Sequence, residues 1–417
     1  MRRRTLIAAA GVAGAALANA QPAGAAPRNG RAAVRTGLDQ LAAEDWARLR
    51  GETVGVVSNL TAVDREYRHL VDRMHAAGVR IGGIFGPEHG FRGSTRVGGD
   101  SGMDARTGLK VYDAYRVTHD QWAALFTEAG VRTVVFDIQD VGARFYTYIW
   151  TLYDSMVAAA RLGLRYVVLD RPNPIGGRAF GPMLKPGFTS GVGLKEIVQQ
   201  HGMTVGELAR FYNGEFLTTP ARLEVVACEG WHGGLFAADT DVPWVMPSPN
   251  MPTPDTAAVY PGTCLFEGVA SISEGRGTTR PFEISGSPSL DYRWRDKVAA
   301  HALPGVALRE AYFVPVTSKF TEQLCGGIEL KVTDASAFDP IRTAVAMLVE
   351  ARKLPGFAWR DDNPGRPPFA DLLFGSDVAR TMIDAAASVT DIVASWQDDL
   401  AAFTKRRQPY LLYPRPR

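Results

Sequence analysis

The sequence is poor in cysteine and has no marked excess of charge of either sign. Its three cysteines, Cys228, Cys264 and Cys325, lie far apart and show no metal-ligand spacing. A chain of 417 residues can build a hydrophobic core without disulfides, so we interpret all three as buried apolar thiols. The formal net charge of +2 gives no basic surface of the kind that binds nucleic acid.

Long apolar runs are missing as well, because no stretch after the first 26 residues approaches the ~20 residues of a membrane-spanning helix. Residues 1–26 are typical of a signal peptide: Arg2, Arg3 and Arg4 precede a short Ala/Gly-rich apolar run, and Ala18-Asn19-Ala20 offers a cleavage site. The arginines also fit export by the twin-arginine route. We therefore expect an exported protein, whose net charge falls from +2 to −1 when these three arginines are removed.

Strand-like and helix-like patterns alternate through the first half of the chain. Apolar runs predict strands at residues 53–58, 81–85, 133–136, 166–169 and 223–227. Amphipathic stretches predict helices at residues 67–77 and 152–162, and capping boxes at Thr118 and Thr204 open two more. This alternation favours an α/β fold with a Rossmann-like, mostly parallel sheet and helices on both faces.

A proline-rich segment at residues 247–254 interrupts the alternation and predicts a domain boundary. Beyond it, a strand at residues 329–332 and helices at residues 340–352 and 378–403 indicate a smaller α+β domain. The predicted organisation is a signal peptide (1–26), a linker (27–35), a Rossmann-like catalytic domain (36–255) and a C-terminal domain that closes a cleft (256–417). No G-x-G-x-x-G follows the first strand and no P-loop occurs, so no nucleotide cofactor is expected.

Polar residues cluster just after each predicted strand. In open parallel sheets, ligands bind at the carboxyl edge of the sheet, where these residues would meet. The residues concerned are Asn59, Glu88, His89, Asp137, Asp140, Asp170, Arg171, Asn173 and Glu229.

Glu88 lies in a turn bounded by glycine and proline, followed by Phe91 and Arg92. A glutamate placed in this way can act as a general acid, with Phe91 shielding it from water. The alternative interpretation is a loop carboxylate that holds backbone N–H groups.

Residues 137–150 combine two aspartates with Arg144, Tyr146 and other aromatic side chains. Aromatic faces and planar hydrogen-bonding groups suit a sugar ring, whereas an Asp–Arg pair with core aromatics would only hold the loop. His89, Asp137 and Asp140 could also form a metal site, although their spacing is not that of a zinc motif. The flexible loop at residues 273–280 carries two arginines, which suit a carboxylate or phosphate ligand unless the loop is merely solvated.

Several blocks resemble the exo-β-N-acetylmuramidase family (NamZ-type, glycoside hydrolase family 171), formerly a domain of unknown function. They are residues 86–93 (GPEHGFRG), 137–148 (DIQDVGARFYTY), 169–177 (LDRPNPIGG), 246–253 (MPSPNMPT), 260–263 (YPGT) and 274–282 (EGRGTTRPF). The resemblance runs from about residue 36 to the carboxyl end. It implies a Rossmann-like catalytic domain, a smaller C-terminal domain with a cleft between them, and a catalytic glutamate at Glu88.

The resemblance also implies a reaction and a substrate. The expected enzyme releases N-acetylmuramic acid from the non-reducing end of peptide-free β-1,4 glycan, such as MurNAc-GlcNAc, without cofactor or metal. Glu88 would protonate the leaving oxygen, and the partner would be Asp137, Asp140, Glu229, Glu274 or the substrate's own 2-acetamido oxygen. The lactyl carboxylate of the sugar needs a cation, for which Arg144, Arg171, Arg276 and Arg280 are candidates.

The full set of expected substrate-binding residues is Asn59, His89, Arg92, Arg144, Tyr146, Arg171, Asn173, Asn250, Arg276, Thr278 and Arg280. Two other functions compete with the hydrolase. One is a metal-dependent deacetylase or amidase acting on the same glycan, and the other is a wall-binding module without catalysis.

Overall fold

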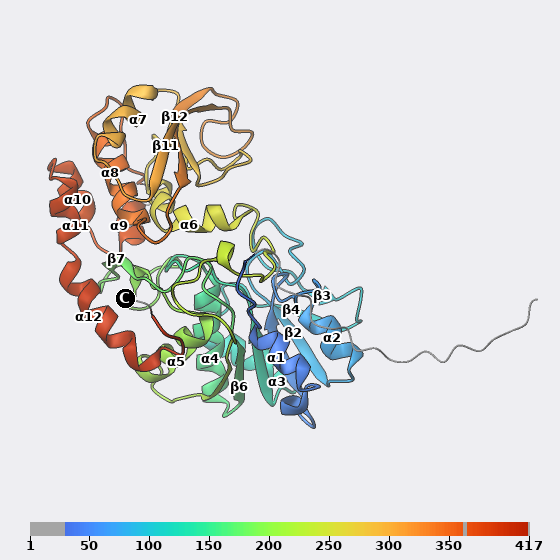
Figure 1. Cartoon of the computed structure of the whole chain (residues 1–417). Coiled ribbons are helices and arrows are strands. Elements are labelled where there is room, and N and C mark those ends of the chain that lie inside the picture. Colours follow the sequence, from blue (N-terminus) through green and yellow to red (C-terminus); the bar gives the residue numbers. More distant parts are fainter. Residues whose placement is uncertain (1–29, 362–364, 416–417) are drawn as a thin grey trace, which may run out of the picture.

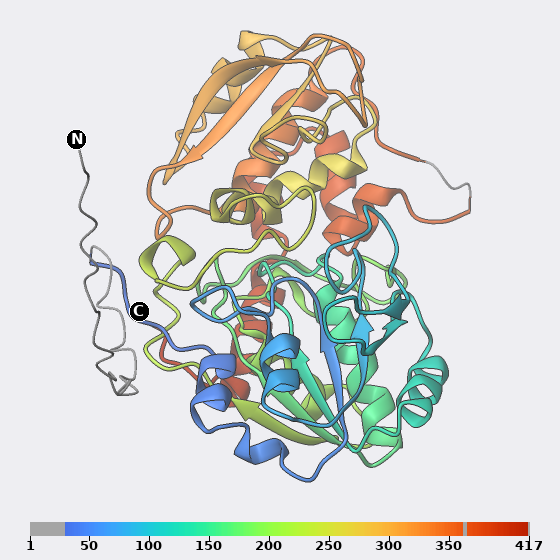
Figure 2. The same cartoon turned by 90° about the vertical axis from the view of Figure 1, so that its right-hand side faces the viewer.

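The computed structural model describes residues 30–361 and 365–415, so the predicted signal peptide lies outside the described residues. The chain forms two lobes, one above the other, in both views (Figures 1 and 2). The lower lobe contains the large sheet built from the first half of the chain. The upper lobe contains a small sheet and helices from the second half.

The large sheet has seven strands in the order β3-β4-β2-β1-β5-β6-β9. Central β1 pairs in parallel with β2 and with β5, and β3 alone is antiparallel at one edge. The mostly parallel α/β fold expected from the sequence is confirmed. The strands are β1 (Val54–Ser58), β2 (Ile81–Gly86), β3 (Gly102–Met103), β4 (Lys110–Asp113), β5 (Thr133–Asp137), β6 (Arg165–Leu169) and β9 (Arg222–Val226).

Helices cover both faces of this sheet. Because side chains alternate along a strand, Val54 and Val56 of β1 enter one apolar cluster and Val57 enters the other. The first cluster includes α1 (Gly37–Ala43) and α2 (Leu70–Ala76). The second includes α3 (His119–Glu128), α4 (Tyr148–Arg161) and α5 (Val205–Glu215). Since apolar side chains fill both faces, the polar groups that follow the strands gather at the edge of the sheet.

The upper lobe is built on an antiparallel sheet in the order β10-β12-β11. Its strands are β10 (Ile284–Ser287), β11 (Val306–Phe313) and β12 (Cys325–Val332), and its helices are α6 (Pro254–Thr263), α7 (Tyr292–Ala299), α8 (Pro340–Arg352), α9 (Phe369–Phe374), α10 (Val378–Asp384) and α11 (Val389–Ala394). Short elements complete the chain: β7 (Phe180–Met183), β8 (Val198–Gln200), η1 (Ala47–Leu49), η2 (Ala237–Asp239), η3 (Cys264–Gly268) and η4 (Gln408–Tyr410). The α+β character of this lobe is confirmed.

Three predicted helices differ from the structure. The helix expected at residues 67–77 begins only at Leu70, because Tyr67 has a left-handed φ of 58° and His69 is the N-cap. The helix expected at residues 152–162 begins earlier, at Tyr148, because the aromatic residues before Leu152 also pack in the core.

The helix expected at residues 378–403 is divided into α10, α11 and α12 (Gln397–Arg407). The first break occurs because Ala386 has a left-handed φ of 58° and Ser388 caps α11, and the second lies at Ser395 and Trp396, which separate α11 from α12.

The end of the chain returns to the lower lobe, although the sequence grouped it with the C-terminal domain. Helix α12 runs down along that lobe towards α5 (Figure 1). The Tyr413 hydroxyl donates to Asp170 Oδ2 at 2.5 Å and accepts from the Cys228 N–H at 2.7 Å. Arg415 pairs with buried Glu207 at 2.5 Å. The end of the chain is therefore anchored to the lower lobe.

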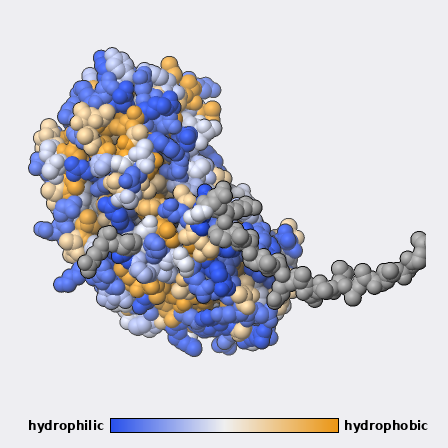
Figure 3. Space-filling view, in the orientation of Figure 1, coloured by the Kyte–Doolittle hydropathy of each residue, from blue (hydrophilic) through white to orange (hydrophobic). Residues whose placement is uncertain are grey.

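The three cysteines are free and buried, as expected. No helix within the described ranges is long and apolar enough to cross a membrane. On the face drawn in Figure 3, hydrophilic residues predominate and hydrophobic residues form separate small patches on both lobes.

Substituting Tyr413 with Phe should destabilise the protein in a pH-dependent way. Burial raises the pKa of Asp170 to about 7, against about 4 in an unfolded chain. At pH 8 the folded carboxylate is ionised and needs the Tyr413 donor, whereas at pH 5 it is protonated in the folded state and needs it less. We expect Tyr413→Phe to lower the free energy of unfolding by about 1–3 kcal/mol at pH 8 and by less at pH 5.

Urea unfolding at both pH values measures this effect. Tyr410→Phe is the matched control, because it removes one hydroxyl bond to the partly exposed Glu215 and should cost less than about 1 kcal/mol. Equal losses for the two variants, or a larger Tyr413→Phe loss at pH 5, would contradict the role given to Asp170.

Candidate active site

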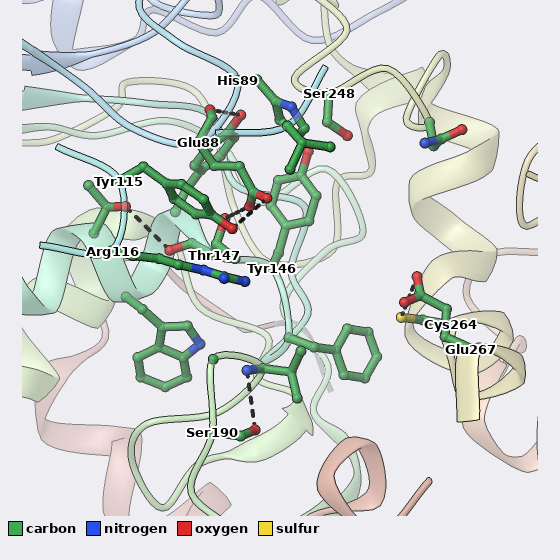
Figure 4. Close-up of a pocket in the computed structure, with 18 of the residues that line it drawn as sticks. Glu88, His89, Tyr115, Arg116, Tyr146, Thr147, Ser190, Ser248, Cys264 and Glu267 are labelled. Carbon is green, nitrogen blue, oxygen red and sulfur yellow. Dashed lines mark hydrogen bonds between the residues drawn. The ribbon is translucent and has the colours of Figure 1, made fainter. Parts of the chain in front are cut away.

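A cavity of about 970 Å³ lies at the carboxyl edge of the large sheet, between the lobes. The lower lobe contributes residues that follow β2, β4 and β5, and the upper lobe contributes η3 and the loop at residues 276–282. This is the edge where the sequence placed the polar residues. A second domain over that edge gives the cavity its far wall (Figure 4).

Glu88 is fixed in this cavity by two hydroxyl groups. Its Oε1 accepts from Tyr115 at 2.9 Å, and its Oε2 accepts from Thr147 at 2.8 Å. Burial and the neighbouring Glu88 raise the pKa of Tyr115 to about 12, so this phenol stays protonated and remains a donor. Tyr115 follows β4 and Thr147 precedes α4, so three chain segments at the sheet edge position one carboxylate.

His89 adjoins the acid on a constrained backbone. Its left-handed φ of 72° is uncommon for a residue other than glycine. Its N–H donates to the Gly98 carbonyl at 2.7 Å, which holds the turn. Its Nδ1 is buried and has no hydrogen-bond partner among the described residues. The residue lines the cavity beside Glu88.

Aromatic rings form one side of the cavity. Tyr146 and Tyr260 meet edge to face with centroids 5.9 Å apart, and Tyr260 meets Phe282 at 4.7 Å. Burial raises the pKa of Tyr146 well above its usual value, so its hydroxyl remains a donor. Rings with polar tips match the apolar faces and hydroxyl rim of a sugar.

Two further carboxylates line the cavity, and each has a partner. Glu267 of η3 accepts from Arg276 at 2.6 Å. Asp154 of α4 contacts His119 Nε2 at 2.9 Å, and burial raises the pKa of this carboxyl. Glu267 and Glu88 come from different lobes and lie on opposite sides of the cavity (Figure 4).

The structure brings five of the expected site residues into the cavity wall. They are Glu88, His89, Tyr146, Asn250 and Arg276. They come from both lobes, so the cavity joins sequence blocks far apart in the chain.

Four of the expected residues are instead buried outside the cavity wall, three of them within the lower lobe and Arg144 between the two lobes. Asp137 and Arg171 form a buried ion pair, in which Arg171 also donates to the Val63 carbonyl. Asp140 accepts from the Gly142 N–H at 2.7 Å and contacts His201 at 3.1 Å. Arg144 is fully buried and donates to three backbone carbonyls, those of Pro182, Ile197 and Leu373. None of the four lines the cavity.

The remaining expected residues lie in turns or ion pairs outside the cavity wall. Arg92 pairs with Asp72 and Asp104, and the expected shield Phe91 packs in the core beside α2 rather than against Glu88. Glu274 is buried and binds Lys319 at 2.9 Å. The others are turn or surface residues: Asn59 accepts from Thr61, Asn173 donates to Met203, Thr278 donates to Gly275, Arg280 pairs with Glu283 and Glu229 pairs with Arg35.

The sequence analysis missed Tyr115, Arg116, Thr147, Asp154 and Glu267. Tyr115 and Arg116 follow β4, whose four residues are too few and too polar to be recognised as a strand. One sequence feature could have located them: Tyr115 and Arg116 come just before the Thr118 capping box, in the turn that leads into α3. Thr147 lay within a quoted block, but nothing in the sequence distinguished it from its neighbours.

Within residues 30–361 and 365–415, no three His, Cys, Asp or Glu side chains gather as a possible metal site. The His89–aspartate set considered for a metal does not assemble, because Asp137 and Asp140 are engaged with Arg171 and His201.

Comparison with known proteins gives the family. The models of exo-beta-N-acetylmuramidase NamZ match both lobes: the N-terminal model matches residues 54–255 and the C-terminal model residues 258–413. The peptidoglycan beta-N-acetylmuramidase NamZ of Bacillus subtilis (strain 168) is 39% identical over 385 residues, which are 91% of each chain.

Two crystal structures of DUF1343 family proteins from Bacteroides fragilis NCTC 9343 share the fold. One has a TM-score of 0.85 with 30% identity, covering 93% of this chain and all of the other. The second has a TM-score of 0.73 with 30% identity, covering 92% and 99%. The chain therefore belongs to the exo-β-N-acetylmuramidase NamZ family.

Proposed function

We propose that Glu88 is the general acid with which this protein, an exo-β-N-acetylmuramidase, releases N-acetylmuramic acid from the non-reducing end of peptidoglycan-derived glycan. The observation that supports the proposal is a pair of hydrogen bonds from the Tyr115 and Thr147 hydroxyls to the two oxygens of Glu88, inside a cavity that has aromatic walls. We call this pair of bonds the hydroxyl clamp. The clamp fixes the direction of the carboxyl group, and a proton can be transferred only along a defined line to the leaving oxygen. The proposed natural substrate is peptide-free MurNAc-GlcNAc glycan.

The upper lobe supports exo action. Glu267 of the upper lobe lies on the side of the cavity opposite Glu88 (Figure 4). A wall on that side would stop a long glycan from passing through the cavity, which favours attack at a chain end. The positive charge that develops at the anomeric carbon is then met by Glu267 or by the substrate's 2-acetamido oxygen. The first-formed anomer of the product, read by NMR, separates two classes of mechanism: direct attack by Glu267 or by the acetamido oxygen gives retention, whereas a water activated by Glu267 gives inversion.

Glu88→Gln tests the acid directly. The amide keeps the shape of the side chain but has no proton to transfer, so kcat/KM on MurNAc-GlcNAc should fall by about 10²–10⁴-fold. A nitrophenyl muramic acid glycoside, whose leaving group is already acidic, should lose less in its glycosylation step. Binding of the product sugar should persist.

Glu229→Gln is the matched control, because it makes the same change at an exposed carboxylate paired with Arg35 on the surface. It should retain wild-type activity. If Glu88→Gln cleaves the disaccharide at the wild-type rate, Glu88 is only a loop anchor.

Activity should also survive exhaustive treatment with EDTA. The residues that would have formed the metal site of a deacetylase are held apart by the Asp137–Arg171 and Asp140–His201 contacts. Disaccharide cleavage measured before and after chelation checks this expectation. A loss of activity that Zn²⁺ restores would favour the deacetylase or amidase alternative instead.

We further propose that the protein acts outside the cytoplasm, on the basis of the arginines and the Ala/Gly-rich apolar run in residues 1–26. Replacing Arg3 and Arg4 with lysine should leave full-length protein in the cytoplasm if the twin-arginine route is used. Cell fractionation and the mass of the exported form measure this. Unchanged export of the double variant would argue for a different route.

A further inference from the structure

The charges around the cavity leave some cations without a counter-ion. Arg276 is already balanced by Glu267 at 2.6 Å and approaches Glu274 at 3.4 Å. In the part of the chain that the structure describes, Arg96, Arg116 and Arg366 line the same cavity and form no ion pair with a carboxylate. An anionic substrate group would meet one of these three rather than Arg276.

Arg116 is the one connected to the acid. Its guanidinium carbon lies 5.0 Å from the centroid of the Tyr115 ring, and the hydroxyl of that ring donates to Glu88 at 2.9 Å. Figure 4 shows the Arg116 side chain running beneath Tyr115 into the cavity towards Thr147 and Tyr146. One aromatic ring therefore sets the position of both the cation and the acid.

The backbone at Arg116 is held in an unusual conformation. Its φ of 56° lies in the left-handed region, which is unfavourable for a residue with a Cβ atom. The turn is fixed by the bond from the Ala114 N–H to the Gly86 carbonyl at 2.9 Å and from the Tyr115 N–H to Asp113 at 2.9 Å. The Thr118 cap of α3 fixes its other end. Such a conformation persists only where the surroundings impose it, and it occurs most often at ligand sites.

We infer that Arg116 binds the lactyl carboxylate of N-acetylmuramic acid and so sets the preference of the enzyme for this sugar; the assignment rests on the function proposed above. The lactyl ether is on C3, two ring carbons from the anomeric carbon that Glu88 must reach. A planar guanidinium pairs with a carboxylate through two parallel hydrogen bonds. N-acetylglucosamine has only a hydroxyl group at this position and gives Arg116 no charge partner. Arg144 and Arg171, two of the four arginines that the sequence offered for this role, are buried away from the cavity.

The experiment compares two nitrophenyl glycosides, one of N-acetylmuramic acid and one of its uncharged lactyl carboxamide. Wild type should prefer the acid by about 10–100-fold in kcat/KM, the value of a hydrogen-bonded charge pair. Arg116→Met keeps the aliphatic stem against Tyr115 and should turn over both compounds at about the wild-type rate for the carboxamide. Arg116→Lys should recover part of the preference.

Arg161→Met makes the same change at an arginine outside the cavity and is the matched control, because Arg161 is exposed on α4 and pairs with Asp120. Its kcat/KM values for the acid and for the carboxamide should both stay at the wild-type values. An Arg116→Met variant that keeps its preference for the acid overturns the assignment, as does loss of the preference in Arg96→Met or Arg366→Met instead. Equal losses on both compounds would make Arg116 a support of Glu88 rather than a specificity residue. Absence of wild-type turnover of either glycoside would instead contradict the proposed function.

Discussion

When both faces of a parallel sheet are buried, polar side chains can gather only at its edges. This constraint determines where the cavity of this protein lies, at the carboxyl ends of the strands. All the strands except β3 run in the same direction, so the loops after β2, β4 and β5 meet at one edge. Apolar residues fill both faces, as the alternation of Val56 and Val57 between the two clusters shows. Glu88, Tyr115 and Thr147 meet because three strands end at the same level.

The sequence predicted this sheet well, since buried parallel strands are continuous apolar runs and are easily recognised. It did not reveal β4, which has one exposed residue at each end and only two buried ones between. Edge strands and short strands carry little hydrophobic signal, and here the missing strand was the one that carries Tyr115 and Arg116. The break between α10 and α11 depended on a single left-handed alanine, Ala386, which composition does not mark.

Candidate residues were predicted by type more reliably than by role. Glu88, His89 and Tyr146 line the cavity. Asp137, Arg144 and Arg171 have side chains equally suited to a sugar, but they are buried and bind other groups of the protein. An arginine after a strand has the same spacing whether it turns inward to a carboxylate or outward to a ligand. The direction is set by which partner is near in space, and Asp137 lies on the strand adjacent to the one that Arg171 follows.

The return of the chain to the lower lobe bears on how the two walls of the cavity are built. The backbone passes between the lobes once before α6 and again between α11 and α12, and the second passage ends with Tyr413 anchored against Asp170. The lobes also share one continuous apolar cluster, in which Phe136 of β5 and Trp150 of α4 belong with Trp294 of α7 and Ile328 of β12. Both walls of the cavity are therefore built on the same core, and the chain that forms them crosses between the lobes twice.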